Sequence, residues 1–285
     1  MTARLRGFSL VELVVVISVI GIIAALGAIF ARPAVEAYSA QRRRGELTDI
    51  ADTALRRMAR DVQRALPNSV RSDTAAGIYL GFLSTRAGGR YRSQPDNDPG
   101  TTEDVLDFSA PDGAFDMLGL LSSVSATVDP GDRVVVHNLG IDGANAYAGD
   151  NTAVIAGVAA GASGIASEQR ITLAAPMQFP LESPGRRFQI ISGPVVYECR
   201  NPGVAAGEGT GLLLRHEGFG ITPVWPPPAA PTASPAVVAT RVSDCALNYA
   251  ALALQARGVV SVRLQLTRDG EMVTLYREIH VNNVP

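Results

Sequence analysis

The sequence predicts an α+β chain, in which a long N-terminal helix packs on an antiparallel β-sheet. Three observations lead to this prediction: an apolar run over residues 8–31, a helical apolar pattern over residues 34–66, and short alternating segments after residue 68. The chain has 285 residues, of which 47 % are apolar. That composition supports a sizeable core and argues against a disordered chain.

The apolar run over residues 8–31 contains one charged side chain, Glu12. As a helix it would be roughly 36 Å long, which is enough to cross a hydrocarbon core of about 30 Å. It is too long and too β-branched for a secretory signal, and no A-x-A-like cleavage site follows it. We therefore expect a transmembrane helix over residues 8–31, with Pro33 kinking or loosening the helix just beyond.

A second, amphipathic helical segment is expected over residues 32–67. Its apolar residues recur at steps of three and four, and Pro67-Asn68 would end it. Residues 32–71 hold nine arginines and five acids, a local charge of +4. This basic surface either contacts acidic neighbours or lipid headgroups, or is a solvated helix face. The apolar residues of the stripe are Leu47, Ile50, Ala51, Ala54, Leu55, Met58, Val62 and Leu66.

Residues 68–285 are expected to form one β-rich head, with no internal repeat and no second domain boundary. The clearest element is a hairpin of residues 259–267 and 272–281, joined at Asp269-Gly270, a strong turn signal. Both strands alternate apolar and polar residues, so one face can pack on the helix. Further expected strands are 78–83, 105–109, 133–139, 152–158, 170–174, 187–191, 195–199, 212–216 and 237–242.

The cysteine content bears on the compartment. Cys199 and Cys245 are the two cysteines of the chain, far apart and without C-x-x-C spacing. This suits one disulfide in an oxidising compartment, which would place the head outside the cytoplasm. The alternative is a pair of free buried thiols in a cytosolic protein.

The composition excludes several function classes. All 25 basic residues are arginine, which excludes a P-loop phosphate clamp, a pyridoxal Schiff base and a catalytic lysine. The net charge of -2 argues against a nucleic-acid binder. The charge is unevenly spread, since residues 72–285 hold 14 arginines against 21 acids. His137, His216 and His280 lack metal-ligand spacing, and no nucleophile elbow occurs. We expect no enzymatic activity.

Two loops are candidate binding sites. Asp96, Asp98, Glu103 and Asp104 alternate in a way that can ligate calcium, but they lack the central glycine and terminal glutamate of an EF-hand. The alternative is a solvated turn. Residues 223–235 contain six prolines and Trp225, which predicts a stiff extended loop. Trp225 is either an exposed contact point or packed against the sheet.

The N-terminal run Arg6-Gly7-Phe8-Ser9-Leu10-Val11-Glu12 resembles the type IV prepilin signal G-F-T-L-x-E, with Ser9 replacing the usual threonine. On this resemblance the chain is identified as a member of the type IV pilin and pseudopilin superfamily, with a pilin-like fold. The resemblance implies that residues 1–7 are a leader and that a prepilin peptidase cuts between Gly7 and Phe8. The same enzyme would methylate the new amine of Phe8. Glu12 would neutralise that amine, or a neighbouring subunit's amine, in a dry core.

Three further segments look like those of the MshO-type minor pilins of mannose-sensitive haemagglutinin (MSHA) pili: residues 54–61, 66–71 and 280–285. This resemblance implies a single-pass inner-membrane protein of a Gram-negative bacterium, with its C-terminal domain in the periplasm and later in a pilus. Its partners would be the prepilin peptidase, other minor and major pilins, the inner-membrane assembly platform and the lipid bilayer. We expect no direct contact with nucleic acid and no cofactor besides the calcium candidate.

Four alternatives remain at this stage. The chain is similar to J-type minor pseudopilins of type II secretion and to W-type minor pilins of type IV pili. It also fits a pilus-tip adhesin module that binds through the proline-rich loop or the calcium candidate. The fourth alternative is a membrane-anchored enzyme that carries the motif by chance.

Overall fold

The computed structural model describes residues 9–73, 78–95, 102–121, 128–161, 168–226, 235–252 and 257–285. Four of the predicted site residues lie outside this part of the chain: Gly7, Phe8, Asp96 and Asp98.

A single helix of 53 residues, α1 (Leu10–Val62), joins the two predicted helical segments. The helix continues through Pro33, because the proline removes only one of the many backbone hydrogen bonds of a long helix. The helix ends at Val62, five residues before the predicted end at residue 67, because the chain turns there to pair with the sheet. The N–H of Leu66 donates to the carbonyl of Leu83, and the N–H of Thr85 donates to the carbonyl of Arg64, each at 2.8 Å.

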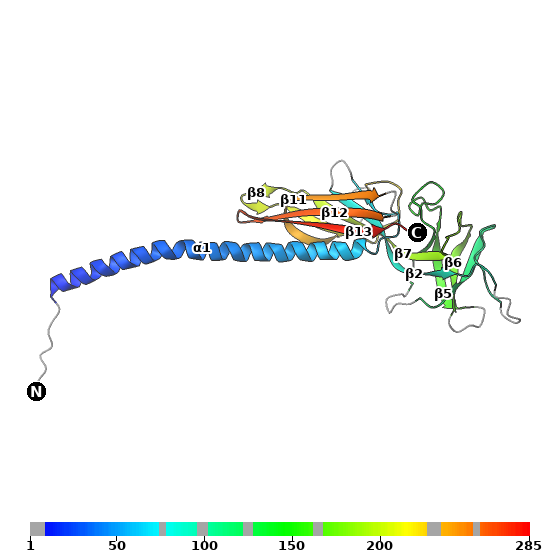
Figure 1. The fold of residues 1–285 in the computed structure, drawn as a ribbon, viewed down its shortest axis with the longest axis horizontal. Helices are drawn as coiled ribbons and strands as arrows, with labels where there is room; N and C mark the ends of the chain where they lie inside the picture. The colour runs from blue at the N-terminus through cyan, green and yellow to red at the C-terminus, as the bar shows by residue number, and fades with distance from the viewer. Residues whose placement is uncertain are drawn as a thin grey trace, which may run out of the picture.

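The α+β prediction is confirmed: α1 packs against an antiparallel sheet of 11 strands (Figure 1). The sheet order is β1-β2-β3-β6-β5-β4-β7-β10-β11-β12-β13. The strands are β1 (Arg71–Ser72), β2 (Tyr79–Tyr91), β3 (Asp112–Leu118), β4 (Arg133–Val136), β5 (Thr152–Ala160), β6 (Glu168–Met177), β7 (Arg187–Arg200), β10 (Gly211–His216), β11 (Ala236–Leu252), β12 (Arg257–Arg268) and β13 (Glu271–Asn282). A separate ribbon joins β8 (Val204–Ala205) to β9 (Glu208–Gly209).

An additional pairing between β2 and β7 closes six of these strands into a ring. Following the pairs from β2 through β3, β6, β5, β4 and β7 leads back to β2. Every pair in this ring is antiparallel, so the six strands form a small closed barrel, which leaves no free edge within the ring. Figure 1 shows this barrel beyond the end of α1, while β11 to β13 lie alongside the helix.

The apolar core is correspondingly divided. The proximal core lies between α1 and the sheet, and it contains Met58, Leu80, Tyr197 and Leu264, all at most 1 % exposed. The distal core fills the barrel with Tyr91, Phe115, Phe188 and Ile190, again at most 1 % exposed. A small cluster between them contains Leu66, Leu83, Val135 and Ile191. The head, predicted as one unit, therefore has two lobes built on shared strands.

Strands β2 and β7 cross from one lobe to the other. Leu80 and Phe82 of β2 belong to the proximal core, and Tyr91 of the same strand belongs to the distal core. The pairing between β2 and β7 shifts register at Ser84/Thr85 and again at Thr85/Ala87. Such irregularities bend and twist a strand, and these two mark the joint between the lobes.

The structure corrects several strand predictions. Residues 105–109 do not form a strand; Leu106 of this segment fills the distal core from a loop, and the unpredicted β3 pairs with β6 instead. Segments 187–191 and 195–199 form one strand, β7, since both pair with β2. The hairpin is confirmed: β12 and β13 pair throughout, and Asp269 (φ 50°) and Gly270 (φ 77°) form its turn.

Candidate functional site

The first turn of α1 carries the assembly residue predicted from the sequence. Ser9 is the N-cap, and its hydroxyl oxygen accepts a hydrogen bond from the N–H of Glu12 at 3.2 Å. A carboxylate in the first turn also faces the positive end of the helix dipole. The peptide bond between Gly7 and Phe8 lies outside the described residues, so the pairing of Glu12 with the Phe8 amine stays a prediction.

The first half of α1 is apolar on all sides and the head does not cover it (Figure 1). Ile17, Ile23 and Phe30 are 60 to 77 % exposed. Among the described residues, α1 is the one helix that is long and apolar enough to cross a membrane. A surface of this kind is strongly unfavourable in water, so it needs a bilayer or other helices around it.

The second half of α1 is held by the head through apolar contacts on one face. Leu47, Ala51, Met58 and Val62 are at most 1 % exposed, which confirms the predicted apolar stripe. They pack against β11, β12 and β13 in the proximal core. Burial of such side chains contributes about 1.5–3 kcal/mol each for the larger ones, so this face fixes the head on the helix.

Ion pairs join the helix to the head beside the turn between β12 and β13. Arg44 Nε lies 2.6 Å from Glu271 Oε2, and Arg268 Nη1 lies 2.8 Å from Glu46 Oε2. Part of the basic surface over residues 32–71 is therefore neutralised by carboxylates of the chain's own head. The basic surface is neither wholly solvated nor wholly available to a partner.

A polar cluster secures the last turn of the helix to the sheet. Asp61 Oδ2 accepts hydrogen bonds from Arg215 Nε at 2.7 Å and from the hydroxyl of Tyr197 at 2.8 Å. Burial and the Asp61 charge raise the pKa of Tyr197 well above its ordinary value. Tyr197 therefore stays protonated and donates its proton to the carboxylate.

The two described carboxylates of the calcium candidate have arginine partners. Glu103 pairs with Arg92, which also pairs with Glu168, and all three side chains are at most 8 % exposed. Asp104 lies 2.9 Å from Arg170, and burial raises the pKa of Asp104 although Arg170 opposes that rise. Within the described ranges, no group of three or more His, Cys, Asp or Glu side chains can hold a metal ion. Calcium binding that involves Asp96 and Asp98 stays a prediction.

Trp225 packs against the sheet. A Cβ atom added to Gly81 of β2 would lie 2.6 Å from the Trp225 ring, so the absence of a side chain there makes room for the indole. Val196 of β7 and Phe219 also line the space that holds the ring. The indole N–H is buried without a hydrogen-bond partner among the described residues. Of the two interpretations of Trp225, the structure therefore favours the packed one.

The predicted disulfide between Cys199 and Cys245 is present. It joins β7 to β11, two strands that flank β10 in the sheet, and both cysteines are buried. The bridge encloses the proline-containing loop that follows β10.

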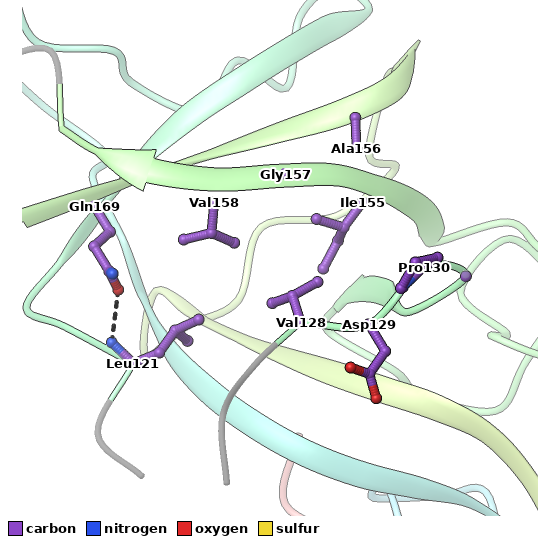
Figure 2. Close-up of a pocket in the computed structure, with 10 residues that line it drawn as sticks. Leu121, Val128, Asp129, Pro130, Ile155, Ala156, Gly157, Val158 and Gln169 are labelled. Carbon is purple, nitrogen blue, oxygen red and sulfur yellow. Dashed lines mark hydrogen bonds between the residues drawn. The ribbon is translucent and has the colours of Figure 1, made fainter. Parts of the chain in front are cut away.

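A hollow of about 520 Å³ lies on the barrel lobe (Figure 2). Ile155 and Val158 of β5 and Val128 form its apolar side, and Asp129 lies at its margin. The carboxylate of Asp129 is paired with Arg86 at 2.8 Å. Among the described residues, the lining holds no histidine, cysteine or second carboxylate, and so none of the usual pairs of an acid–base or nucleophilic site.

Sequence reasoning did not identify two sets of polar partners. Arg92 and Arg170 pair with Glu103 and Asp104, and Asn68 bonds to Asn283, but no local spacing in the sequence identifies any of these pairs. The one available signal for the asparagines was their position in two of the three segments that carried the subfamily resemblance.

The comparisons with known proteins agree with the N-terminal site. Residues 3–28 match the family described as "Prokaryotic N-terminal methylation motif". No curated protein and no solved structure matches the chain. The motif followed by an uncovered apolar helix is consistent with inner-membrane anchoring before pilus assembly. The chain is a type IV pilin-like protein with a prepilin peptidase cleavage and methylation motif, and proteins of this superfamily are structural subunits, not enzymes.

Proposed function

We propose that this chain is a minor pilin of MSHA-type pilus biogenesis. A prepilin peptidase cuts it between Gly7 and Phe8 and methylates Phe8, and the mature subunit then enters a type IV pilus-like fibre. The observation that carries the proposal is the methylation motif directly before a helix half that is apolar on all sides and free of the head. Before assembly the bilayer covers that half, and in the fibre neighbouring helices cover it.

The barrel lobe supports a role at the start of the fibre. Subunits anchored in one membrane pack with their helices in the same direction. The barrel lies beyond the end of α1, farthest from the membrane-spanning half (Figure 1). It would occupy the space in which the head of a preceding subunit lies. A subunit of this shape fits best where no subunit precedes it, which is the tip.

The J-type pseudopilin of type II secretion shares the same processing and helix, so the choice of system rests on the resemblance in residues 54–61, 66–71 and 280–285. Genes for a pilus or a secretion machine beside this gene would separate the two. A tip adhesin is the second candidate, favoured by the hollow on the barrel lobe.

N-terminal sequencing tests the proposal. The full chain, expressed with a prepilin peptidase, should begin at methylated Phe8, while an inactive peptidase should leave Met1 in place. A chain that keeps Met1 with the active enzyme, or that begins beyond residue 31, would overturn the proposal.

The role of Glu12 needs a separate measurement. Glu12→Ala should still be processed but should be largely absent from sheared fibres. Glu36→Ala removes an exposed carboxylate farther along the same helix and serves as the matched control. Equal incorporation of the two variants would remove the assembly role of Glu12 while leaving the processing step intact.

A further inference from the structure

Two exposed arginines of the barrel lobe face each other across neighbouring strands. Arg90 of β2 lies directly opposite Arg187 of β7 in the register of the sheet. The next residues of these strands, Tyr91 and Phe188, fill the distal core, so the two arginines, hereafter the arginine pair, lie on the outer wall of the barrel. Like charges directly opposite in an antiparallel pair are unfavourable. Neither arginine forms an ion pair with a residue in the described ranges.

The turn before β7 brings the two side chains to the same point of backbone. Arg90 Nε donates a hydrogen bond to the carbonyl of Gly185 at 3.3 Å. The side chain of Arg187 lies against the same glycine, since a Cβ atom added to Gly185 would lie 3.3 Å from Arg187 Nε. A single anion beside this glycine therefore meets both positive charges.

Other arginines of the same lobe already have carboxylate partners within the chain. Arg86, Arg92 and Arg170 each form ion pairs with two carboxylates. The fold thus neutralises these guanidinium groups and leaves the arginine pair with two adjacent positive charges. An anion from another molecule would supply the charge-assisted hydrogen bonds that the pair lacks.

The arginine pair borders a second hollow, of about 410 Å³. Leu118 of β3, which lies directly opposite Arg90, and Leu120 give this hollow an apolar side at 42 and 54 % exposure. Gly88 of β2 also lines the second hollow and has no side chain to fill it. The volume lies within the roughly 300–1,000 Å³ of small-ligand sites.

Gln189 of β7 adds a hydrogen-bonding group to the lining of the second hollow. It lies two residues from Arg187 along the strand, so the two side chains share one face. Its Oε1 atom is buried and accepts no hydrogen bond from a described residue. A buried acceptor without a donor is unfavourable. A ligand hydroxyl in the second hollow supplies that donor once the terminal amide of Gln189 turns toward it.

The surroundings of the second hollow disfavour a peptide strand and a lipid as its occupant. At Arg90, β2 is paired with β3 on one side and with β7 on the other, so the wall has no free edge to which a strand could be added. The barrel lies beyond the end of α1, farthest from the membrane-spanning half (Figure 1). The bilayer that holds this chain is therefore out of reach of the arginine pair.

We propose that the second hollow binds the acidic sugar units of an anionic polysaccharide. The carboxylate of one unit binds both guanidinium groups of the arginine pair, and a hydroxyl group donates to Gln189. The C–H face of the sugar ring lies on Leu118. A uronate ring combines these three features, namely an anion, hydroxyl donors and a small apolar face. This inference goes beyond the proposed function, because it assigns a ligand class to the barrel lobe whichever fibre the chain enters.

Binding by the purified full chain in detergent at physiological salt tests the inference. A galacturonate tetramer should bind wild type, and Arg90→Gln/Arg187→Gln should bind it about tenfold more weakly, since each partly exposed charge pair contributes a few-fold. The control Arg64→Gln/Arg257→Gln removes the same charge from two exposed arginines outside the barrel and should bind as wild type does. Equal weakening in the two variants, or no binding to wild type at millimolar tetramer, overturns the inference.

Two other probes separate sugar from charge alone. Maltotetraose has the rings without carboxylates and should not bind. Tetraglutamate has the carboxylates without rings and should bind about tenfold more weakly than the galacturonate tetramer, because it brings no hydroxyl donor to Gln189. Tetraglutamate binding as tightly as the galacturonate tetramer overturns the sugar assignment in favour of an acidic peptide.

Urea denaturation of the same variants distinguishes a binding role from a structural one. Arg90→Gln/Arg187→Gln removes an unfavourable contact between like charges, so its unfolding midpoint should equal or exceed that of wild type. A midpoint clearly below that of wild type would show that the arginine pair holds the barrel together, and it would overturn the pair as a ligand site.

Discussion

Asn68 and Asn283 are joined by two hydrogen bonds across 215 positions of sequence. The N–H of Asn68 donates to Oδ1 of Asn283, and Nδ2 of Asn68 donates to the carbonyl of Asn283, each at 3.2 Å. Nδ2 also donates to the carbonyl of Asn138, which follows β4. Asn68, in the segment between α1 and β1, thus ties the segment after β13 to the barrel lobe.

Asn68→Ala should lower the free energy of unfolding by about 2–3 kcal/mol. It removes two side-chain donors and places a Cβ-bearing residue without local hydrogen bonds at φ 59°. Urea denaturation of the full chain in detergent, followed by the fluorescence of Trp225, gives the value. Glycine adopts a positive φ at little cost, so Asn68→Gly should lose roughly 1 kcal/mol less unfolding free energy than Asn68→Ala. Equal losses in the two variants would show that the backbone conformation contributes nothing.

Gly81→Ala should displace the Trp225 ring. The new Cβ would lie 2.6 Å from Cη2 and Cζ3 of the indole, which is closer than packed atoms approach. We expect red-shifted fluorescence, easier quenching by acrylamide and a stability loss of about 1–3 kcal/mol. Gly157→Ala is the control, since its Cβ meets nothing within 4 Å. An unchanged emission spectrum for Gly81→Ala would contradict the packed position of Trp225.

Loss of the disulfide should destabilise the head. Cys199 and Cys245 are 46 positions apart, and closing a loop of that length stabilises the folded state by about 4 kcal/mol in the chain-entropy account. The double variant Cys199→Ala/Cys245→Ala should therefore unfold at lower urea. Reduction of the wild-type chain by dithiothreitol should give the same midpoint as the double variant. A wild-type midpoint in the variant would leave the bridge without a stabilising role.

The stability of the head should depend on pH through Glu198. Burial raises the pKa of this carboxyl, but hydrogen bonds from Arg200 and His216 outweigh burial and hold the pKa below its usual range. A lowered folded-state pKa stabilises above the unfolded value, and that contribution is lost as the pH falls through the folded-state value. Wild type and Glu198→Gln should therefore differ most near pH 7 and converge as the pH falls below about 4.5, the ordinary pKa of a glutamate carboxyl.

The control for this comparison is Glu182→Gln, which removes an exposed carboxyl. Its stability should stay parallel to that of wild type over the same range. A Glu198→Gln curve that also stays parallel to wild type would remove Glu198 as the source of the pH dependence.

Local sequence signals predicted the elements that depend on neighbouring residues. The hairpin turn needs two residues with positive φ, and Asp269-Gly270 supplies them without help from the rest of the chain. The stripe from Leu47 to Val62 follows the helical period. The apolar run of α1 and its first-turn Glu12 are equally local.

Long-range pairing explains what the sequence did not reveal. Residues 105–109 carry the alternation of a strand, but Leu106 is buried at 3 % exposure from a loop, because β6 pairs with β3 instead. The closing of the barrel depends on β2 meeting β7, about 100 positions later in the chain. Arg170, the partner of Asp104, is also far away in the sequence, and no local spacing identifies Arg92 as the partner of Glu103. An exposed acidic turn and a neutralised one therefore have the same sequence pattern.

The joint between the two lobes has a mechanical consequence. The barrel is connected to the helix-bearing lobe by β2 and β7, and both connections are strands already close to the full length of an extended chain. A tensile force between the barrel and the first half of α1 therefore cannot lengthen these two connections by straightening the chain. Elongation begins only when sheet hydrogen bonds break. The barrel lobe therefore cannot be pulled away from the helix-bearing lobe while the sheet stays intact.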